Sequence, residues 1–443
     1  MIEEAKNLIE KQLKKLNVKK WELLLTKTFT IENQFRGFDL EITRDYEVLN
    51  YFLRIFVDKN DKMGIGVVQG STLDEKIINE TINSAIKMAN LNSSIKHDLI
   101  SPGLKYPTLD IAENKIISNP FDFIQDISEK LTNIISRYKG VIPTFGKLRA
   151  YINDKKLVNH LGLELDSKST YLFIEYALKA ESTNNLAEYW AKSYFKNSDQ
   201  LDLENKIPKW AKIAKDTLVA KRPQLQKSAT VLFPPIVLKD AFTNTIGFHI
   251  TGKSKVEKIS KIKIGDQIAS KEFNLTDNGI LTGGLRTHPW DGEGTPQRLT
   301  KIIENGVFTS RIYDLKHAQI LNKKSTGNGI RSSNGTIEND FTNLEISPGN
   351  TKLSDIISQI KSGVIVEEFS WLNPNRITGD FGAEIRNGYI IKNGEISTPI
   401  KGGNLSGNVF DMIKNIEFIS IERNFEENTL IPYIVCKNLI ISS

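Results

Sequence analysis

Residues 21–70 read WELLLTKTFTIENQFRGFDLEITRDYEVLNYFLRIFVDKNDKMGIGVVQG, and this stretch decides the fold of the N-terminal half. Its β-branched and aromatic runs alternate with polar residues, which is typical of antiparallel strands. Gly64 and Gly66 interrupt the last of these strands. Apolar residues then recur at helical spacing between Ile77 and Ala89, so we expect a helix of several turns directly after the strands.

The segments around this stretch alternate between helix and strand patterns. Apolar residues between Ile2 and Leu16 form one stripe of an amphipathic helix, whose Lys-rich face we expect to be solvated rather than bound to a membrane. A second helix is expected at about 121–138, and strand patterns return at about 147–180. We therefore expect the N-terminal half to be an α+β layer, an antiparallel sheet with packed helices.

Linker composition marks the boundary between two domains. The segment AKRPQLQKSA at 220–229 carries Pro223 and interrupts the regular patterns, so we place the boundary near 222–228. Turn and strand patterns dominate the chain after this point. The fold class is therefore expected to be α+β, with an N-terminal α+β domain at 1–222 and a β-rich C-terminal domain at 228–443.

Asn-Gly pairs indicate where strands of the second half turn. They occur at 278–279, 305–306, 387–388 and 393–394. Both residue types tolerate the positive φ that a two-residue type I′ turn requires. Apolar runs flank the second and the fourth pair, in KIIENGVFTSRIY and YIIKNGEISTPI, so these two are the clearest hairpin predictions.

One helix is predicted inside the strand-rich half. Its apolar residues run from Leu353 to Ile360 at helical spacing. Asn350 or Thr351 is expected to cap its beginning, and Gly363 is expected to lie past its end.

The composition excludes several classes of protein. The chain has 443 residues, of which 39% are hydrophobic and 25% charged, which excludes a disordered chain, a collagen and a coiled-coil rod. No stretch approaches about 18 uninterrupted apolar residues, and Glu3 and Glu4 do not fit a secretory signal, so we expect a cytoplasmic protein without a membrane span. Cys436 is the only cysteine, so no intramolecular disulfide can form, and its apolar surroundings predict a buried strand thiol.

The charge distribution gives little support for a nucleic-acid surface. The 59 basic and 53 acidic residues leave a net charge of +6 over the whole chain. The densest basic stretch, between Lys253 and Lys263, is interrupted by Glu257 and flanked by Asp266. Because nucleic-acid surfaces need clustered Lys and Arg, we expect none here.

Familiar catalytic motifs are absent from the sequence. None of the five histidines is followed by Glu, and no two lie within one helical turn, so the helical motif of zinc proteases is missing. The G-x-S-x-G and P-loop patterns are also missing, and the glycines at Gly64 and Gly66 lack a third glycine because position 69 is Gln69. A metal site assembled from distant loops stays open at this point.

Three segments contain more polar residues than a folded core and its turns would require. They lie at 290–298, 324–331 and 373–382, and each combines glycines with acids or hydroxyls. Such a combination lets the backbone approach a ligand while side chains fix its polar ends. Asp291 and Glu293 could act as a general acid/base pair, or they could cap an irregular turn of their own loop, which composition alone favours.

In their order and spacing, these segments resemble the TldD/PmbA family, historically described as modulators of DNA gyrase. The resemblance runs through DGEGTPQRLTKIIENGVF, YDLKHAQILNKKSTGNGIR and NRITGDFGAEIRNGYIIKNGEISTPIKGGNLSGN, and it covers most of the C-terminal half. It implies a two-domain cytoplasmic α+β protein that acts in the proteolysis of small or unfolded polypeptides. It also implies two branches that pair with one another. TldD members bind a metal through H-E-x-x-x-H on a helix early in the C-terminal domain, whereas PmbA members, also called TldE, lack that motif.

The sequence departs from the TldD pattern at the metal motif. The equivalent place follows SATVLFPP and reads IVLKDAFTNTIG at 236–247, without a histidine. A zinc protease site needs neutral imidazole ligands and an open position for water, which Asp240 alone cannot supply. The chain therefore resembles the PmbA (TldE) branch, for which we expect no cofactor in this chain and zinc in a TldD-like partner subunit.

The resemblance implies a PmbA/TldE-like subunit of a heterodimeric TldD/TldE-type metalloprotease complex, one that helps to hold a peptide in a cavity. We expect this chain to have no catalytic or metal-binding residues of its own. An extended peptide can pair with a sheet edge with little sequence preference, which suits a β-rich domain. The residues expected to line the substrate cavity or the partner interface are Asp291, Glu293, Arg298, Ser325, Thr326, Asn328 and Asp380.

Three alternatives stay open at the level of sequence. A self-sufficient metallopeptidase would need a metal site built from scattered residues. A DNA- or gyrase-associated regulator would match the historical description of the family. A homodimer formed by the isolated chain would make it a scaffold without a protease partner.

Overall fold

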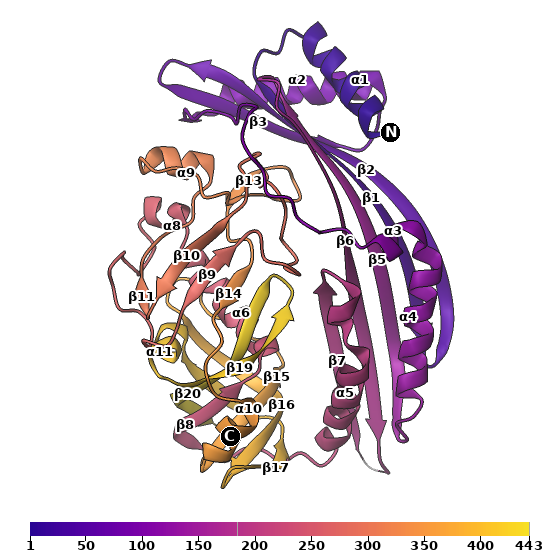
Figure 1. The fold of residues 1–443 in the computed structure, drawn as a ribbon, viewed down its shortest axis with the longest axis vertical. Helices are drawn as coiled ribbons and strands as arrows, with labels where there is room; N and C mark the ends of the chain where they lie inside the picture. Colours follow the sequence, from indigo (N-terminus) through magenta and orange to yellow (C-terminus); the bar gives the residue numbers. More distant parts are fainter. Residues whose placement is uncertain (184, 443) are drawn as a thin grey trace.

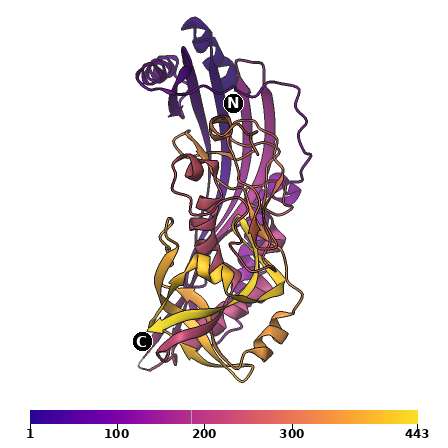
Figure 2. The same ribbon diagram turned by 90° about the vertical axis from the view of Figure 1, so that its left-hand side faces the viewer.

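The computed structural model describes residues 1–183 and 185–442 and divides most of their strands between two large β-sheets. Figure 1 shows the long, curved strands of the first sheet beside the shorter strands of the second, with the chain ends at opposite ends of the long axis. Figure 2 shows the same arrangement from the side, with the C-terminal strands at the end away from α1 (Ile2–Lys15). The predicted α+β class, an antiparallel N-terminal sheet followed by a β-rich C-terminal part, is confirmed.

The first sheet joins seven strands of the described residues, and all of its pairings are antiparallel. In space the order is β4-β3-β2-β1-β5-β6-β7. The strands predicted within 21–70 and at 147–180 are confirmed. The bounds of these strands are β1 (Trp21–Arg36), β2 (Asp39–Lys59), β3 (Lys62–Gly70), β4 (Ser94–Ile95), β5 (Val141–Asn159), β6 (Glu164–Glu181) and β7 (Leu186–Phe195).

Helices cover one end and one face of the first sheet. At one end, α1 and α2 pack on β1 and β2 through a cluster that includes Ile9, Ile82 and Leu53. Along the strands, α4 and α5 share a second apolar cluster with the sheet (Figure 1). The helices predicted in this half are confirmed. After α1 the helices are α2 (Glu75–Leu91), α3 (Asn114–Ser118), α4 (Pro120–Ile135), the 3₁₀-helix η1 (Ser198–Leu201) and α5 (Leu203–Thr217).

The period of two in these strands gives the sheet one apolar and one polar face. Leu148 and Ala150 of β5, with Ile174 of β6, lie in the cluster that contains α4 and α5. Residues of the opposite parity, such as Asn153 and Lys155, line a cavity on the other face together with loops of the C-terminal half. The first sheet therefore presents a polar wall to the second half of the chain.

The second sheet joins eleven strands of the described residues around β20, which pairs with β8, β14, β18 and β19. Its β8–β15 and β14–β20 pairs are parallel, and its other pairings are antiparallel. The strands are β8 (Gln226–Phe233), β9 (Leu275–Asn278), β10 (Leu299–Glu304), β11 (Val307–Phe308), β14 (Leu344–Ile346), β15 (Ser362–Phe369), β16 (Asp380–Lys392), β17 (Glu395–Ile400), β18 (Asn404–Asn408), β19 (Ile416–Glu426) and β20 (Thr429–Ser442), beside a separate ribbon of β12 (Gly329–Arg331) and β13 (Ile337–Asn339).

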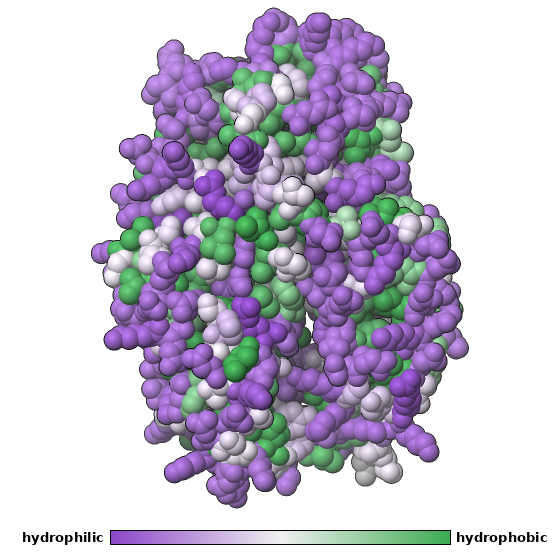
Figure 3. Space-filling model, in the orientation of Figure 1, coloured by the Kyte–Doolittle hydropathy of each residue, from purple (hydrophilic) through white to green (hydrophobic). Residues whose placement is uncertain are grey.

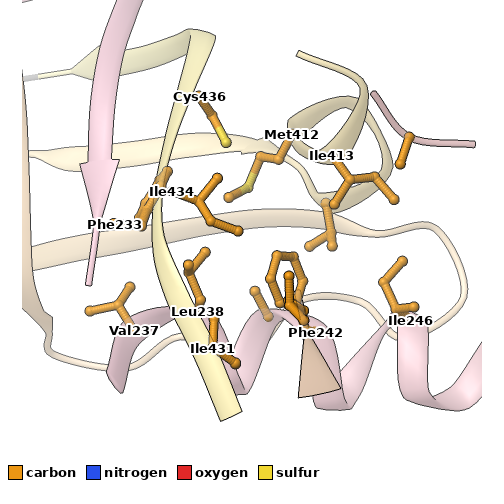
Figure 4. Packing of buried hydrophobic residues seen from close by; sticks show 14 of the residues in the cluster. Phe233, Val237, Leu238, Phe242, Ile246, Met412, Ile413, Ile431, Ile434 and Cys436 are labelled. Carbon is orange, nitrogen blue, oxygen red and sulfur yellow. The ribbon is translucent and has the colours of Figure 1, made fainter. Parts of the chain in front are cut away.

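The core of the C-terminal half lies between β20 and the helix that follows β8. Figure 4 shows Leu238 and Phe242 of this helix near Ile431 and Ile434 of β20. Cys436 of β20 is buried, and burial raises the pKa of its thiol, so the prediction of a buried strand thiol is confirmed. The helices of this half are α6 (Pro235–Asn244), α7 (Ile246–His249), α8 (Gly252–Val256), α9 (Leu315–Ile320), α10 (Leu353–Gln359) and α11 (Val409–Lys414).

Two of the four Asn-Gly pairs turn the chain. The pairs at 305–306 and 393–394 join β10 to β11 and β16 to β17, with positive φ at all four residues, as predicted. The pairs at 278–279 and 387–388 have no residue with positive φ, so the prediction of type I′ turns there is wrong.

Tertiary contacts keep one of these pairs extended inside β16. The buried Asn387 amide donates to Glu368 Oε2, and its oxygen accepts a hydrogen bond from Thr217 Oγ1 at 2.6 Å. A Cβ on Gly388 would lie 2.4 Å from the Ile365 carbonyl oxygen, so glycine is required here by close approach of the neighbouring strand. The Asn-Gly pair at 387–388, which resembles a turn in sequence, is therefore explained by packing inside β16.

The helix predicted after Asn350 is present as α10, but its cap differs. The N–H of Leu353 does not donate to the side chain of Asn350 or Thr351. It donates instead to Glu422 Oε2 at 2.9 Å. Gly363 lies past the end of α10, as predicted, and belongs to β15. The cap prediction is wrong because a residue from a neighbouring strand supplies the acceptor.

The outer surface is mostly hydrophilic in the view of Figure 3, with smaller hydrophobic patches near its middle. No helix of the described residues combines the length and the hydropathy needed to cross a membrane.

Candidate functional site

The first polar segment, 290–298, inserts between the two halves of the chain. Trp290 packs in an apolar cluster with leucines of β1, β5 and the loop after β5. Gly294 has a φ of +86°, and a Cβ there would lie 2.9 Å from a methyl group of Leu163. The Tyr106 hydroxyl donates a hydrogen bond to the Gly294 carbonyl oxygen at 2.9 Å. The loop is therefore anchored to the N-terminal half by close packing and by its backbone.

Asp291 caps the turn of its own loop. Its Oδ1 accepts hydrogen bonds from the N–H groups of Glu293 at 2.9 Å and Thr295 at 2.8 Å. Its Oδ2 accepts from the N–H of Gly329 at 2.9 Å, which ties the first polar segment to the second. Of the two alternatives for this carboxylate, the geometry matches the capped turn.

Glu293 joins a buried set of charges that crosses from one half of the chain to the other. Its Oε2 accepts from the N–H of Leu315 at 2.9 Å, and its Oε1 lies 3.6 Å from Arg54 Nη1. Arg54 Nη1 also donates to Glu22 Oε1 at 3.2 Å, and Arg331 Nη2 pairs with the same oxygen. We call Glu22, Arg54, Glu293 and Arg331 the junction network.

The carboxyl groups of this region outnumber its guanidinium groups when Asp291 is counted. Burial opposes ionisation of Glu22, but Arg54 and Arg331 outweigh it and lower the pKa of this carboxyl. Burial raises the pKa of Glu293 to about 8 and the pKa of Asp291 to about 6. Burial therefore favours the protonated form of Glu293 more than that of the other carboxyl groups in this region.

The second polar segment is fixed by hydrogen bonds inside the C-terminal half. Asn328 Nδ2 donates to Asp277 Oδ2 at 2.6 Å, and Thr326 Oγ1 donates to Asn328 Oδ1 at 2.6 Å. The Ser325 hydroxyl donates to the Tyr313 carbonyl oxygen at 3.1 Å. Burial raises the pKa of Asp277 to about 6. These side chains position the loop rather than face solvent.

The structure separates two of the seven candidate residues from the other five. Asp291, Glu293 and the residues of the second segment meet in the buried region between the polar loops. Arg298 is exposed just before β10, and Asp380 is exposed at the start of β16, where its Oδ1 accepts from Asn408 Nδ2 at 2.8 Å. The candidate set thus falls into an inner cluster, in which only Thr326 is half-buried, and two surface positions.

Sequence reasoning missed the residues that the N-terminal half contributes. Glu22 and Arg54 each stand between two apolar residues in the sequence of β1 and β2, and both are buried. A charged residue within an apolar strand pattern indicates that an oppositely charged side chain lies nearby, because unpaired charges are costly to bury. Lys155 gave no such signal, since it stands beside other polar residues in β5.

A cavity of about 700 Å³ lies between the polar face of the first sheet and the loops of the C-terminal half. Asp291, Gly292 and Arg331 connect it to the region described above. Its lining combines hydroxyls, amides, aromatic rings and cations: Leu24, Thr26, Thr28, Phe52, Asn153, Lys155, Ser169, Tyr171, Tyr194, Lys196, Leu285, Arg286, His288, Trp290, Asp291, Gly292, Gln297, Ile330, Arg331, Ser332, Ser333, Glu427 and Asn428.

A smaller hollow of about 250 Å³ lies over α6. It is lined by Lys239, Asp240, Thr243 and Asn244, which form the half-buried face of this helix. Lys239 Nζ lies 3.3 Å from Asp240 Oδ1 and 3.4 Å from Glu427 Oε1. A zinc ion needs electron-pair donors, and a paired ammonium beside one carboxylate does not provide them. The residues of α6 therefore do not fit a zinc ion.

The histidines are engaged elsewhere. Both ring nitrogens of His249 are used, because Nδ1 accepts from the N–H of Lys261 at 3.0 Å and Nε2 contacts the Ile377 carbonyl oxygen at 3.1 Å. His317 Nδ1 lies 2.7 Å from Asp314 Oδ1, on the first turn of α9. Within residues 1–183 and 185–442, no three His, Cys, Asp or Glu side chains gather as metal ligands would.

Comparison with known proteins shows what this chain is similar to. Residues 226–443 match the PmbA/TldA metallopeptidase C-terminal domain. An uncharacterized protein of Methanocaldococcus jannaschii is 27% identical over 95% of this chain and 96% of its own. A metalloprotease TldD homologue of Buchnera aphidicola is 30% identical over 53% of this chain and 50% of its own, and a metalloprotease PmbA homologue of the same species is 25% identical over 88% and 85%.

Solved structures share the fold along the whole chain. TldE from Thermococcus kodakarensis is similar with a TM-score of 0.87 at 21% identity, over 99% of this chain and 100% of its own. A Thermotoga maritima protein described as a candidate modulator of a DNA gyrase gives a TM-score of 0.86 at 20% identity, over 100% of both chains. The resemblance carried by the polar segments is thereby confirmed: the chain is a relative of the TldD/PmbA proteins and carries the PmbA/TldA metallopeptidase C-terminal domain at residues 226–443.

Proposed function

We propose that the chain is a PmbA/TldE-like subunit of a TldD/TldE-type metalloprotease complex that acts on small or unfolded polypeptides. The observation that carries this proposal is the half-buried face of α6. An H-E-x-x-x-H motif laid on this face would fall on Lys239, Asp240 and Asn244. The ion pairs of Lys239 with Asp240 and Glu427 put a cation where a metal ion would need a ligand.

In this proposal a TldD-like partner supplies the zinc and the bond-breaking step, and this chain supplies a wall for the peptide. The cavity of about 700 Å³ has the size of typical small-ligand sites. Arg286, Glu427 and Asn428 line both this cavity and the hollow over α6. A peptide held in the cavity would therefore lie close to the α6 face.

The candidate residues take different roles in the proposal. The buried Asp291, Glu293, Ser325 and Asn328 and the half-buried Thr326 would shape the loops that close the cavity. Arg298 and Asp380 are exposed and would face the partner. The proposal also keeps the division into domains at 1–222 and 228–443, a heterodimer as the working form, and a cytoplasmic location. It assigns no catalytic residue to this chain.

Co-expression tests the proposal directly. The chain would be co-expressed with a TldD-like subunit that carries H-E-x-x-x-H and is encoded in the same genome. We expect the two to co-purify as a heterodimer by light scattering. We also expect cleavage of an unfolded polypeptide by the pair, inhibition by a chelator, and no cleavage by this chain alone.

Each alternative gives a different result in the same experiment. Chelator-sensitive cleavage by this chain alone would contradict the proposal and support a self-sufficient peptidase. A homodimer that excludes the TldD-like subunit would support a scaffold. Salt-dependent binding to duplex DNA, without cleavage by the pair, would support a DNA-associated regulator.

A further inference from the structure

Two cations on the cavity wall have no anionic partner. Lys155 lies on β5, and Lys196 follows directly after the end of β7. These two strands flank β6 on either side, and both lysines line the same cavity. Lys196 is 6% exposed. Within residues 1–183 and 185–442, neither ammonium makes an ion pair, and Lys155 Nζ contacts the ring nitrogen Nε2 of His288 at 3.4 Å. We call Lys155 and Lys196 the lysine pair.

The other charges of the cavity wall are already satisfied by the protein. Arg331 pairs with Glu22, and Arg286 Nη1 lies 3.0 Å from Asp340 Oδ2. The carboxylate of Asp291 is occupied by three backbone N–H groups, and Glu427 pairs with Lys239 on α6. No acid of the wall is therefore left to neutralise the lysine pair.

Burying an unpaired ammonium is costly, and the pKa values reflect this. Burial lowers the pKa of Lys155 to about 8 and, together with the charge of Lys155, lowers the pKa of Lys196 to about 7. Burial and the two ammonium groups also lower the pKa of His288 well below its usual value. A positive pocket of this kind is stabilised by an external anion.

The groups around the lysine pair suit a carboxylate attached to a larger molecule. Thr28 Oγ1 donates to Asn153 Oδ1 at 2.6 Å, so the neighbouring wall already carries an ordered row of polar groups. Tyr171, Tyr194 and Phe52 add aromatic surface to the same cavity. A cavity of about 700 Å³ is far larger than a carboxylate or phosphate ion requires. The space beside the cations can hold several residues of an extended peptide.

We propose that Lys155 and Lys196 form an anion subsite that binds the C-terminal carboxylate of a peptide. Both ammonium groups would donate charge-assisted hydrogen bonds to the carboxylate oxygens. The rest of the peptide would extend along the cavity toward Arg286, Glu427 and Asn428, which border the α6 face. This inference rests on the proposed function, because it names the part of a peptide that this subunit holds.

Calorimetric titration of the isolated full-length chain tests the subsite. The probes are acetyl-tetra-alanine with a free C-terminal carboxylate and the same peptide as a C-terminal amide. We expect the free acid to bind and amidation to weaken binding roughly 10-fold or more. Equal binding of the two peptides, or no binding of either, would overturn the subsite.

Variants identify the cations responsible. Lys196→Met and Lys155→Met should weaken binding of the free acid to the level of the amide, and Lys196→Arg should retain most of it because the charge is kept. Lys179→Met is the matched control, since Lys179 lies on β6 and pairs with Glu181 at 3.1 Å outside the cavity. Loss of binding in the control, or wild-type binding in both methionine variants, would contradict the inference.

Two further measurements separate the possible failures. Inorganic phosphate that binds the wild-type chain more tightly than the free-acid peptide would show a site for a free anion and overturn the peptide assignment. If the complex with the TldD-like subunit cleaves polypeptides but this chain shows no carboxylate preference, only the subsite fails. If carboxylate binding needs the lysine pair but no active complex forms, the subsite stands on its own and the proposed function fails.

Discussion

The junction network, through Arg331, and the lysine pair both reach the same cavity, but their charges are compensated to different degrees. In the junction network, Glu22 sits between Arg54 and Arg331, so its charge is compensated within the protein. In the lysine pair, Lys155 and Lys196 have no carboxylate partner among the described residues. Compensated charges hold the two halves of the chain together, whereas uncompensated charges are available for a ligand.

Breaking the junction network should give the largest effect on stability. Glu22→Gln removes the carboxylate that two buried guanidinium groups share, and we expect a loss of about 3–5 kcal/mol in the free energy of unfolding. Urea denaturation followed by circular dichroism measures it. Glu181→Gln, which breaks the exposed pair with Lys179, is the control and should change stability by about 0.5 kcal/mol or less. A Glu22→Gln effect as small as that of the control would contradict the role of the network.

The raised pKa of Glu293 predicts a pH dependence of stability with the opposite sign to that of Glu22, whose pKa is lowered. The pKa of Glu293 is raised to about 8 in the folded chain, so the folded state binds more protons than the unfolded state above its unfolded pKa of about 4.5. The contribution of Glu293 is therefore complete below about pH 4.5 and is lost as the pH rises to about 8. Glu293→Gln should flatten this part of the stability profile, by roughly 2–4 kcal/mol across the range. A profile unchanged by the substitution would show that Glu293 is ionised at neutral pH.

The lysine pair predicts a smaller effect with a gain in stability. The pKa of Lys196 is lowered to about 7, so between about pH 7 and pH 10 the unfolded state binds more protons, and stability rises with pH. Lys196→Met should stabilise the ligand-free chain by about 1–3 kcal/mol at neutral pH and remove this rise. Lys179→Met should leave both unchanged. A destabilised Lys196→Met variant would indicate a structural role for this ammonium.

The exposed candidates should give the smallest effect on the isolated chain. Asp380 is fully exposed, so Asp380→Asn should leave the unfolding midpoint and the junction between the two halves unchanged. If Asp380 faces the partner, as proposed, the substitution should weaken only the complex with the TldD-like subunit. Light scattering of the mixed subunits measures that difference. A lowered midpoint of the isolated chain would place Asp380 in the structural group instead.

Local patterns predicted the elements whose stability is local. Spacing and turn chemistry alone predict the strands within 21–70, the first three long helices of the chain and the hairpins at 305–306 and 393–394. The turn predicted at 387–388 was wrong because Gly388 is needed there for the close approach of a carbonyl oxygen from a neighbouring strand. The cap predicted for α10 was wrong because the actual acceptor, Glu422, is distant in sequence.

Contacts between residues distant in sequence matter even more in the candidate site. The sequence drew attention to Asp291 and Glu293, which the structure brings together in one buried turn. It could not show that Arg54, which pairs with Glu293, and Glu22, which pairs with Arg54, come from strands more than two hundred residues away. Nor could it distinguish Lys155 from the exposed lysines of the chain, because only the packing of two halves makes it a wall of a cavity.

Metal analysis of the co-purified heterodimer and of each separated subunit tests the central claim most directly. The account predicts zinc in the TldD-like subunit, no bound zinc in this chain, and no cleavage of polypeptides by this chain in the presence of added zinc. One zinc ion per chain in this subunit, held through dialysis and required for its own cleavage of polypeptides, would contradict it.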